Sequence, residues 1–365
     1  MKHSPLQDQH GAREAKMADF GGWLMPIDYP KTGTIAEHTA VRERVGIFDV
    51  SHLGKVSVKG RGALKLLNRA FTNDLNRIGD GQAQYTMMCS DQGGVIDDLI
   101  VYRNSAEDFL LVPNAANTSE VVAALQTLQA LAPTNIEVRN LHDQFGVIAI
   151  QGPDSPAVLE KLGVKQVLDY MSFERVSLAG SEVVLCRTGY TGEMGFEILP
   201  KWNETEKVWI AIVDAMQSFG GVICGLGARD TLRTEMGYPL HGHELSLQIT
   251  PVQASANWAI GWDKDEFVGH EALRRERADG APRKLRGIKM IGRGIPRAHM
   301  QVQNSADEAI GEITSGTFSP TLKRGIALGL LSPTVSVGDL VKIDIRGNLC
   351  DAEIVKVPFV PSHVR

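Results

Sequence analysis

A change of pattern near residue 283 constrains the fold more than any other feature of the sequence. Before it, strand-like and helix-like patterns alternate, whereas beyond it helical periodicity disappears. Residues 341–346 and 349–357 alternate apolar and polar side chains on either side of Gly347-Asn348, which predicts a β-hairpin with this pair in the turn. We therefore expect an all-β barrel or sandwich over residues 284–365.

The rest of the chain mixes strand and helix patterns, which indicates an α+β fold. Strands are predicted over the start of 55–67 and over 95–102, 146–151 and 182–187. Helices are predicted after Gly62, from Asn117 or Ser119 up to Pro133, after Ser155 as N-cap, after Asn203 as N-cap, and near Arg229. Segment 274–283 is rich in charge and contains Gly-Ala-Pro, so it predicts a surface linker.

Length and charge narrow the class of protein. The 365 residues leave room for two or three domains. With 38 Lys+Arg against 43 Asp+Glu the net charge is −5, which disfavours a non-specific binder of nucleic acid or of anionic membranes. The four cysteines form no CxxC pair, and no apolar run approaches the roughly 18 residues of a membrane span. Residues 1–17 lack the pattern of a signal or transit peptide, so we expect a cytoplasmic protein.

Two adjacent carboxylates interrupt an apolar strand pattern at Asp97 and Asp98. Neighbours on a strand face opposite ways, so Asp98 shares a face with Ile100 and Asp97 shares one with Leu99. One acid is then expected in solvent or bonded to the Gly93-Gly94 turn. The other points into the interior, where burial perturbs its pKa enough for proton transfer. The alternative, equally compatible with the pattern, is a strand-end turn with both acids in solvent.

Two further charged residues stand in unusual positions. Glu197 lies in an apolar strand pattern, where a carboxylate suits a planar ligand with two adjacent N–H donors. Its alternative is an ion pair with Arg187. Arg229 lies at a predicted helix start, where the helix dipole repels a cation, which hints at an anionic ligand. On spacing alone, a surface pairing with Asp230, the acid capping the helix, is favoured.

Other motifs indicate less. His241-Gly242-His243-Glu244 has the residue types of a zinc site, but no partner cluster lies nearby in the sequence, so a polar loop after a helix is favoured. His52 is a possible base, and a capping or core histidine is favoured instead. Gly225-Leu226-Gly227 lacks the third glycine of a dinucleotide fingerprint, so no nucleotide cofactor is expected.

Six segments taken together resemble one known family. They are 19–26 (DFGGWLMP), 48–52 (FDVSH), 93–98 (GGVIDD), 187–193 (RTGYTGE), 225–230 (GLGARD) and 314–320 (TSGTFSP). In this order, over nearly the whole chain, they resemble the glycine cleavage system T-protein family.

The resemblance implies three domains in a cloverleaf around a central folate channel. The implied folate-binding α+β domain is discontinuous and comprises 1–52 plus 141–265. An inserted, ferredoxin-like α+β domain is implied over 53–140. The C-terminal β-barrel would span 284–365 after a linker at about 266–283.

The implied activity is that of an aminomethyltransferase. It would move the aminomethyl-derived carbon from the lipoyl arm of H protein to tetrahydrofolate, giving 5,10-methylenetetrahydrofolate, ammonia and dihydrolipoyl H protein. Tetrahydrofolate is then a co-substrate, and no metal or nucleotide is implied. The P and L proteins of glycine cleavage would be indirect partners, with no nucleic acid or membrane partner.

The family's functional residues map onto this sequence as follows. The implied catalytic acid is Asp98, the implied folate-binding pair is Glu197 and Arg229, and the implied aromatic lining is Tyr85, Tyr102, Tyr170 and Tyr190. A buried carboxylate near folate N5 and N10 is able to relay a proton and to stabilise developing positive charge. Glu197 would accept the pterin N3–H and 2-amino groups, and Arg229 would meet anionic or carbonyl groups.

The sequence departs from the family pattern at a few positions, which puts edge contacts in doubt. Leu53 replaces a usual Met, Gln253 and Ser255 replace a usual Glu and Gly, and the tail 358–365 lacks an aromatic found in some members. Two other functions remain open: a tetrahydrofolate-dependent S- or O-demethylase of the same superfamily, and a non-catalytic folate-binding protein. The acid at Asp98 argues against the first, since simple methyl transfer has less need of it. Its retention with the folate-binding pair argues against the second.

Overall fold

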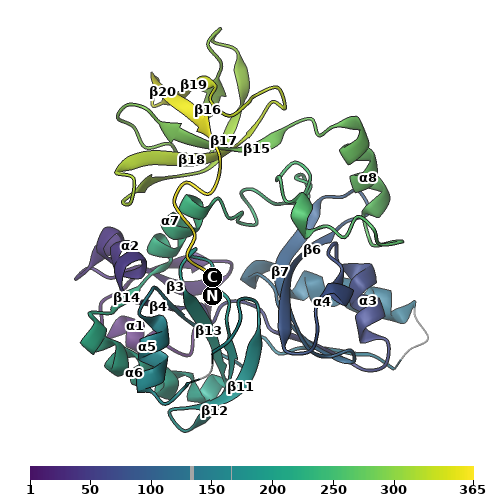
Figure 1. Cartoon of the computed structure of the whole chain (residues 1–365), viewed down its shortest axis with the longest axis vertical. Helices are drawn as coiled ribbons and strands as arrows, with labels where there is room; N and C mark the ends of the chain where they lie inside the picture. Colours follow the sequence, from purple (N-terminus) through teal and green to yellow (C-terminus); the bar gives the residue numbers. More distant parts are fainter. Residues whose placement is uncertain (132–134, 166) are drawn as a thin grey trace.

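The computed structural model describes residues 1–131, 135–165 and 167–365, which form three lobes (Figure 1). Two lobes mix helices and strands, and the third is a closed barrel of six strands. The three lobes meet around a common centre, with the barrel at the top of Figure 1. The expected α+β class, cloverleaf arrangement and C-terminal all-β barrel are confirmed.

The first lobe is built on a six-stranded sheet of order β11-β12-β13-β10-β4-β14. Its strands are β4 (Gly46–Asp49), β10 (Ile148–Gln151), β11 (Phe173–Leu178), β12 (Ser181–Cys186), β13 (Gly195–Pro200) and β14 (Val222–Cys224). Its helices are α2 (Gly33–Glu43), α5 (Ser155–Lys161) and α6 (Thr205–Met216). Trp209 of α6 packs in the core of this lobe with Ile148 and Ile198 of the sheet. Since β4 pairs with β10, the sheet joins segments that lie far apart in the chain.

The second lobe is a five-stranded antiparallel sheet of order β6-β7-β8-β5-β9. Its strands are β5 (Val56–Lys59), β6 (Gln82–Cys89), β7 (Val95–Ser105), β8 (Asp108–Val112) and β9 (Glu137–Asn140), and its helices are α3 (Ala63–Ala70) and α4 (Thr118–Ala130). Leu67 of α3 and Leu125 of α4 pack against Leu99 and Val101 of β7 in one core. Leu99 and Val101 of β7 therefore face this core, whereas Asp98 and Ile100 between and beside them point to the other face of the sheet.

The third lobe is the barrel, of strand order β15-β18-β17-β16-β19-β20. Its strands are β15 (Lys284–Met290), β16 (Gln301–Gln303), β17 (Ala309–Ser319), β18 (Arg324–Leu331), β19 (Leu340–Ile345) and β20 (Asn348–Val355). The expected hairpin is present as β19 and β20, but its turn residues are Arg346 and Gly347, one position earlier than predicted. Both have positive φ, 56° and 83°, which is what a two-residue hairpin turn of type I′ requires.

The remaining elements join the lobes. The strands β1 (Lys2–His3), β2 (Lys16–Phe20) and β3 (Trp23–Asp28) form a small sheet of order β1-β3-β2, accompanied by α1 (Gln7–Gly11), and two further helices are α7 (Leu226–Met236) and α8 (His270–Asp279). The predicted linker 274–283 is helical over its first residues, because α8 extends through Asp279 with Leu273 buried and its other side chains mostly exposed. Within the described ranges, no helix is both long and apolar enough to cross a membrane.

Other helix boundaries differ slightly from the predictions. The helix expected near Arg229 starts earlier, at Leu226, and the N-cap of α5 is Asp154, with Ser155 as the first helical residue. Since the chain enters α6 through a short 3-10 turn, its N-cap is Glu204 rather than Asn203. Pro133, predicted to end α4, lies outside the described residues.

Helix α7 connects the first lobe to the barrel (Figure 1). Its Glu235 is fully buried and accepts hydrogen bonds from His38 (2.8 Å) and Arg42 (2.7 Å) of α2 and from Ser319 of β17. A further link to the barrel is the Arg233 guanidinium, which donates to Ser315 Oγ (2.7 Å). These paired groups fix α7 between two lobes. The residues of α7 that point to the centre of the molecule, such as Arg229, are therefore held in place.

Candidate functional site

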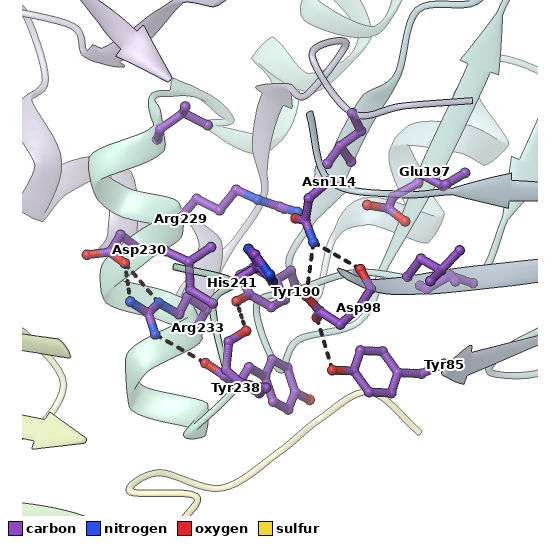
Figure 2. Close-up of a pocket in the computed structure, with 18 of the residues that line it drawn as sticks. Tyr85, Asp98, Asn114, Tyr190, Glu197, Arg229, Asp230, Arg233, Tyr238 and His241 are labelled. Carbon is purple, nitrogen blue, oxygen red and sulfur yellow. Dashed lines mark hydrogen bonds and ion pairs between the residues drawn. The ribbon is translucent and has the colours of Figure 1, made fainter. Parts of the chain in front are cut away.

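A cavity of about 470 Å³ lies at the centre, between the five-stranded sheet, the six-stranded sheet and α7. The seven residues that the sequence singled out all line it: Tyr85, Asp98, Tyr102, Tyr170, Tyr190, Glu197 and Arg229. Figure 2 shows Asp98 on β7, Glu197 on β13 and Arg229 on α7 around the same space. The fold therefore brings together three charged groups from three separate elements.

Asp98 lies half-buried at the cavity wall, on the face of β7 directed away from the lobe's own core. Its Oδ2 accepts a hydrogen bond from the Tyr85 hydroxyl (3.0 Å), and its Oδ1 accepts one from Asn114 Nδ2 (2.9 Å; Figure 2). Burial raises the pKa of Asp98 above its ordinary value. An acid in a perturbed interior environment was one of the two predicted arrangements, and the alternative with both acids in solvent is wrong.

Asp97 faces the opposite way and is fully buried. Its carboxylate accepts hydrogen bonds from the backbone N–H of Asn114 (3.0 Å), from Asn114 Nδ2 (2.9 Å) and from Asn117 Nδ2 (2.7 Å). The expectation that one acid is solvated or bonded to the Gly93-Gly94 turn is therefore wrong. Sequence reasoning missed Asn114, because its position beside Asp98 depends on the pairing of β7 with β8, which Asn114 follows.

Glu197 is held by a short chain of hydroxyl groups. The Thr188 hydroxyl donates to Glu197 Oε2 at 2.6 Å, and the Tyr102 hydroxyl lies 3.1 Å from Thr188 Oγ1. Tyr102 itself is buried, edge-on against Phe173, so its main contribution is to fix Thr188. The alternative ion pair with Arg187 is wrong, because that guanidinium donates to backbone carbonyl oxygens instead. One carboxylate oxygen of Glu197 is thus oriented by the protein, at the edge of the cavity.

Arg229 projects from the first turns of α7 across the ring of Tyr190, with its guanidinium carbon 4.8 Å from the ring centroid. Its Nη1 is buried and has no hydrogen-bond partner within the described structure. Burial lowers the pKa of Arg229, an effect that the nearby Glu197 opposes. The favoured pairing with Asp230 is wrong, because Asp230 pairs with Arg233 at 2.7 Å. A buried, unpaired guanidinium N–H fits a site that receives a ligand oxygen.

Aromatic side chains form much of the remaining wall. Tyr85 stacks on Trp258, with ring centroids 5.1 Å apart, and Tyr190 stacks on Tyr238 at 5.8 Å. Trp258 is 66% exposed although it lines the cavity, so this edge of the cavity faces solvent. Tyr170 is approached from the C-terminal tail by the guanidinium of Arg365, at 5.7 Å. Flat rings on several sides suit a planar ligand.

The side chains of the histidine motif at 241–244 have other partners in the described structure. His243 contacts the carbonyl oxygen of Thr314 (2.9 Å), and Glu244 pairs with Arg233 (2.9 Å). Over residues 1–131, 135–165 and 167–365, no three His, Cys, Asp or Glu side chains are grouped closely enough to hold a metal ion. Residues 241–244 lie in a loop that follows α7, as the favoured interpretation predicted.

His52 also lines the cavity, edge-on against Phe20. Burial lowers its pKa to about 3, and its Nδ1 has no partner in the described part of the chain. His52 is therefore a neutral wall residue rather than a cap.

The departures from the family pattern lie at the wall of the cavity or outside it. Leu53 lines the wall. Gln253 instead binds Glu276 of α8 (2.7 Å) and Arg283 (2.8 Å), outside the cavity. The tail reaches the first lobe through His363, which pairs with Glu193 at 2.9 Å.

Comparison with known proteins agrees with this architecture. The family model described as the GCVT N-terminal domain matches residues 6–264, and the one described as the glycine cleavage T-protein C-terminal barrel domain matches residues 283–361. A protein of Parafrankia sp. (strain EAN1pec) named aminomethyltransferase is 53% identical over 365 residues, which cover 100% of this chain and 99% of that protein. A Mycobacterium tuberculosis (strain H37Rv) protein of the same name is 52% identical over 365 residues, covering 100% of this chain and 98% of its own.

A solved structure extends the likeness to three dimensions. The glycine cleavage system aminomethyltransferase T of Bartonella henselae superposes with a TM-score of 0.92 at 30% identity, covering 99% of both chains. Full-length family matches, relatives above 50% identity and a shared fold lead to one conclusion: this chain belongs to the glycine cleavage T-protein family.

Proposed function

We propose that the protein catalyses the aminomethyltransferase reaction of glycine cleavage, with lipoylated H protein as donor and tetrahydrofolate as acceptor. The products are 5,10-methylenetetrahydrofolate, ammonia and dihydrolipoyl H protein. The observation that carries the proposal is the single cavity in which Asp98, Glu197 and Arg229 meet between aromatic walls. Relatives named aminomethyltransferase over the full chain support it.

Tetrahydrofolate fits the polar groups of the cavity. Glu197 offers a carboxylate fixed by Thr188 and suited to the two adjacent donors of the pterin, N3–H and the 2-amino group. The unpaired Nη1 of Arg229 offers a donor to a carbonyl or anionic oxygen of the folate. Tyr85, Tyr170 and Tyr190 line the walls that would contact its flat rings.

The chemistry requires proton movement without net oxidation. The aminomethyl carbon leaves its sulfur and its nitrogen and forms bonds to N5 and N10 of the folate. The two protons released from N5 and N10 end on the lipoyl sulfur and on the departing amine, so the atoms balance. A carboxyl group of raised pKa beside the reacting nitrogens is able to pass these protons. Asp98 is the group we assign to this role.

The same proposal assigns the partners and the cellular location of the protein. The direct macromolecular partner is lipoylated H protein, and the P and L proteins act indirectly through the lipoyl arm. We propose a cytoplasmic enzyme with tetrahydrofolate as its only small co-substrate and with no metal, nucleotide, nucleic-acid or membrane partner.

We also propose the domain boundaries that the family resemblance implied. The folate-binding domain is assigned to 1–52 plus 141–265, and the inserted, ferredoxin-like domain to 53–140. The barrel domain is 284–365, after a linker at about 266–283. The pairing of β4 with β10 supports the discontinuous domain, since it places the two segments in one sheet.

The demethylase and the non-catalytic binder are not favoured, because the relatives are named aminomethyltransferase over the whole chain. The experiment that tests the proposal supplies aminomethylated H protein and tetrahydrofolate, and measures ammonia and the folate product. We expect ammonia and methylenetetrahydrofolate in equal amounts. Formation of 5-methyltetrahydrofolate from a methyl donor, or folate binding without turnover, would contradict it.

A further inference from the structure

We propose that Asp97 is a positioning residue: the structure holds it as a fixed anion that keeps the proton of the Asp97–Asp98 pair on Asp98. Nothing in the transfer reaction itself requires a second acid in this strand, and Asp97 does not line the cavity. The inference rests on the proposed function only in assigning the transfer step to Asp98. The protonation of the pair is a property of the protein alone.

The two carboxylates are joined through one amide group. Asn114 Nδ2 lies 2.9 Å from Asp97 Oδ1, 2.9 Å from Asp98 Oδ1 and 2.9 Å from the backbone oxygen of Asp98. All three neighbours are oxygen atoms, so the side-chain amide must present its amino group to them. A single donor group therefore bridges both acids and fixes their relative position.

A second amide group holds Asp97 from the other side. Asn117 Nδ2 lies 2.7 Å from Asp97 Oδ1 and 3.0 Å from His241 Nδ1. His241 Nε2 lies 3.2 Å from the carbonyl oxygen of Val95, which only accepts, so Nε2 carries the hydrogen. His241 Nδ1 is then the acceptor, and both hydrogens of the Asn117 amide are used.

Counting hydrogens locates the charge. Asp97 receives three N–H donors, two from side-chain amides and one from the backbone of Asn114, and none of these groups accepts a hydrogen bond. A proton on Asp97 would thus have no acceptor among these partners. It would also point towards the hydrogen of one of the N–H donors. The Asp98 partner Tyr85 has a hydroxyl that both donates and accepts, so a protonated Asp98 remains satisfied.

Electrostatic repulsion between the two acids favours a state in which one of them is neutral. A buried and a half-buried carboxylate that share one donor repel each other, which raises the pKa of the pair and favours one neutral member. No cation is among their hydrogen-bond partners. The titratable groups that face Asp98 are Tyr85 on β6, Tyr190 on the loop after β12 and His241 after α7, besides Asp97 itself. Burial and the charge of Asp98 raise the pKa of Asp97, and the hydrogen bonds from Asn117 and Asn114 oppose that rise.

Residue-assigned ¹³C NMR titration of the side-chain carboxyl groups in the wild-type chain, without substrates, tests the inference. We expect the Asp98 carboxyl carbon to have the shift of a neutral acid at neutral pH, and the Asp97 carbon to have that of a carboxylate. The reverse assignment, or two ionised groups, would overturn the proposal. This titration requires no turnover, so its outcome is independent of whether the proposed function is correct.

Variants add a second, functional measurement. In Asp97→Asn the pKa of Asp98 should fall by about one unit or more, because a neighbouring negative charge is removed. When the rate of aminomethyl transfer is plotted against pH, the fall in rate on the alkaline side (the high-pH limb) should move to lower pH by the same amount. The double variant Asp97→Asn/Asn117→Asp returns a carboxylate to the cluster and should move the limb back.

Asp91→Asn, at an exposed position in the turn before β7, is the matched control and should leave the profile in place. A merely structural role for Asp97 would lower thermal stability without moving the limb. That result, with the Asp98 titration unchanged in Asp97→Asn, would overturn the inference. If Asp97→Asn does not fold, the wild-type titration still decides.

Discussion

The guanidinium carbon of Arg229 lies over the ring of Tyr190, 4.8 Å from the ring centroid, while one of the guanidinium nitrogens is buried and has no partner within the described residues. The cation–π contact with the ring holds the guanidinium in place, and the nitrogen without a partner leaves one N–H for a ligand. The pair therefore acts as a fixed donor on the α7 side of the cavity, opposite the sheet that supplies Glu197.

Replacing Arg229 by Lys should weaken tetrahydrofolate binding about tenfold, because the ammonium group keeps the charge but neither stacks as a plane nor presents a fork of donors. Binding titration with the folate alone measures the effect. Arg275→Lys, on the exposed face of α8, is the matched control. An unchanged dissociation constant in Arg229→Lys would remove Arg229 from the binding site.

Glu197→Gln should raise the dissociation constant for tetrahydrofolate by about 10- to 100-fold, since hydrogen bonds to a charged group are worth about 1.5–3 kcal/mol. The amide replaces one acceptor oxygen with a donor that faces the pterin donors. Turnover at saturating folate should fall much less than the affinity. Glu182→Gln, at the exposed position of the otherwise buried strand β12, serves as control, and equal losses in both variants would contradict the specific role.

Asp98→Asn should lower the rate of aminomethyl transfer by about 10²- to 10⁴-fold and leave folate affinity nearly unchanged. Asparagine keeps the shape and the contact to Tyr85 but neither takes nor gives a proton. Ammonia release from aminomethylated H protein measures the rate, and equilibrium binding measures the affinity. Near wild-type turnover would show that another group moves the proton.

Glu235 should make stability depend on acid pH. Burial alone would raise its pKa, but His38 and Arg42 lower it to about 2. The stabilisation is therefore complete above its unfolded pKa and is lost as pH falls from about 4.5 towards 2, about 3 kcal/mol in total. Glu235→Gln should lose it at neutral pH and flatten the acid limb in denaturant unfolding, whereas Glu43→Gln, at an exposed end of α2, should change neither. An unchanged acid limb in Glu235→Gln would contradict the assignment.

Gly94→Ala should destabilise the start of β7. An added Cβ would lie 1.9 Å from the backbone oxygen of Leu247, so the segment that receives the Val95 N–H must move. Overpacking of this kind costs about 1–3 kcal/mol and should lower the melting temperature. Gly292→Ala, where an added Cβ meets nothing within 4 Å, is the control. Equal melting temperatures in the two variants would show that the contact yields without cost.

Local patterns predicted much of the fold. Alternation in β19 and β20 indicated the hairpin, and local patterns indicated the helices α4 and α6, because these features depend only on near neighbours in the chain. The turn was placed one residue late, since Gly347 occupies the second turn position rather than the first. The helical start of 274–283 was missed, because its exposed charges also fit a linker.

The candidate site likewise has parts that the sequence predicted and parts that it left open. Family motifs singled out Asp98, Glu197 and Arg229, yet spacing alone favoured a surface pair for Arg229 and left both aspartates open. Only the tertiary structure showed that Asp230 pairs with Arg233 and that Asn114 bridges the two acids.

The sequence by itself determined which strands and helices form, that the C-terminal part is all β, and which family the motifs resemble. Tertiary structure decided which charges are buried together, because burial and the choice of partner depend on how separate elements of the chain pack against one another. Asp98 and Glu197 lie on different sheets, and the electrostatic environment of each exists only once the lobes have closed around one cavity.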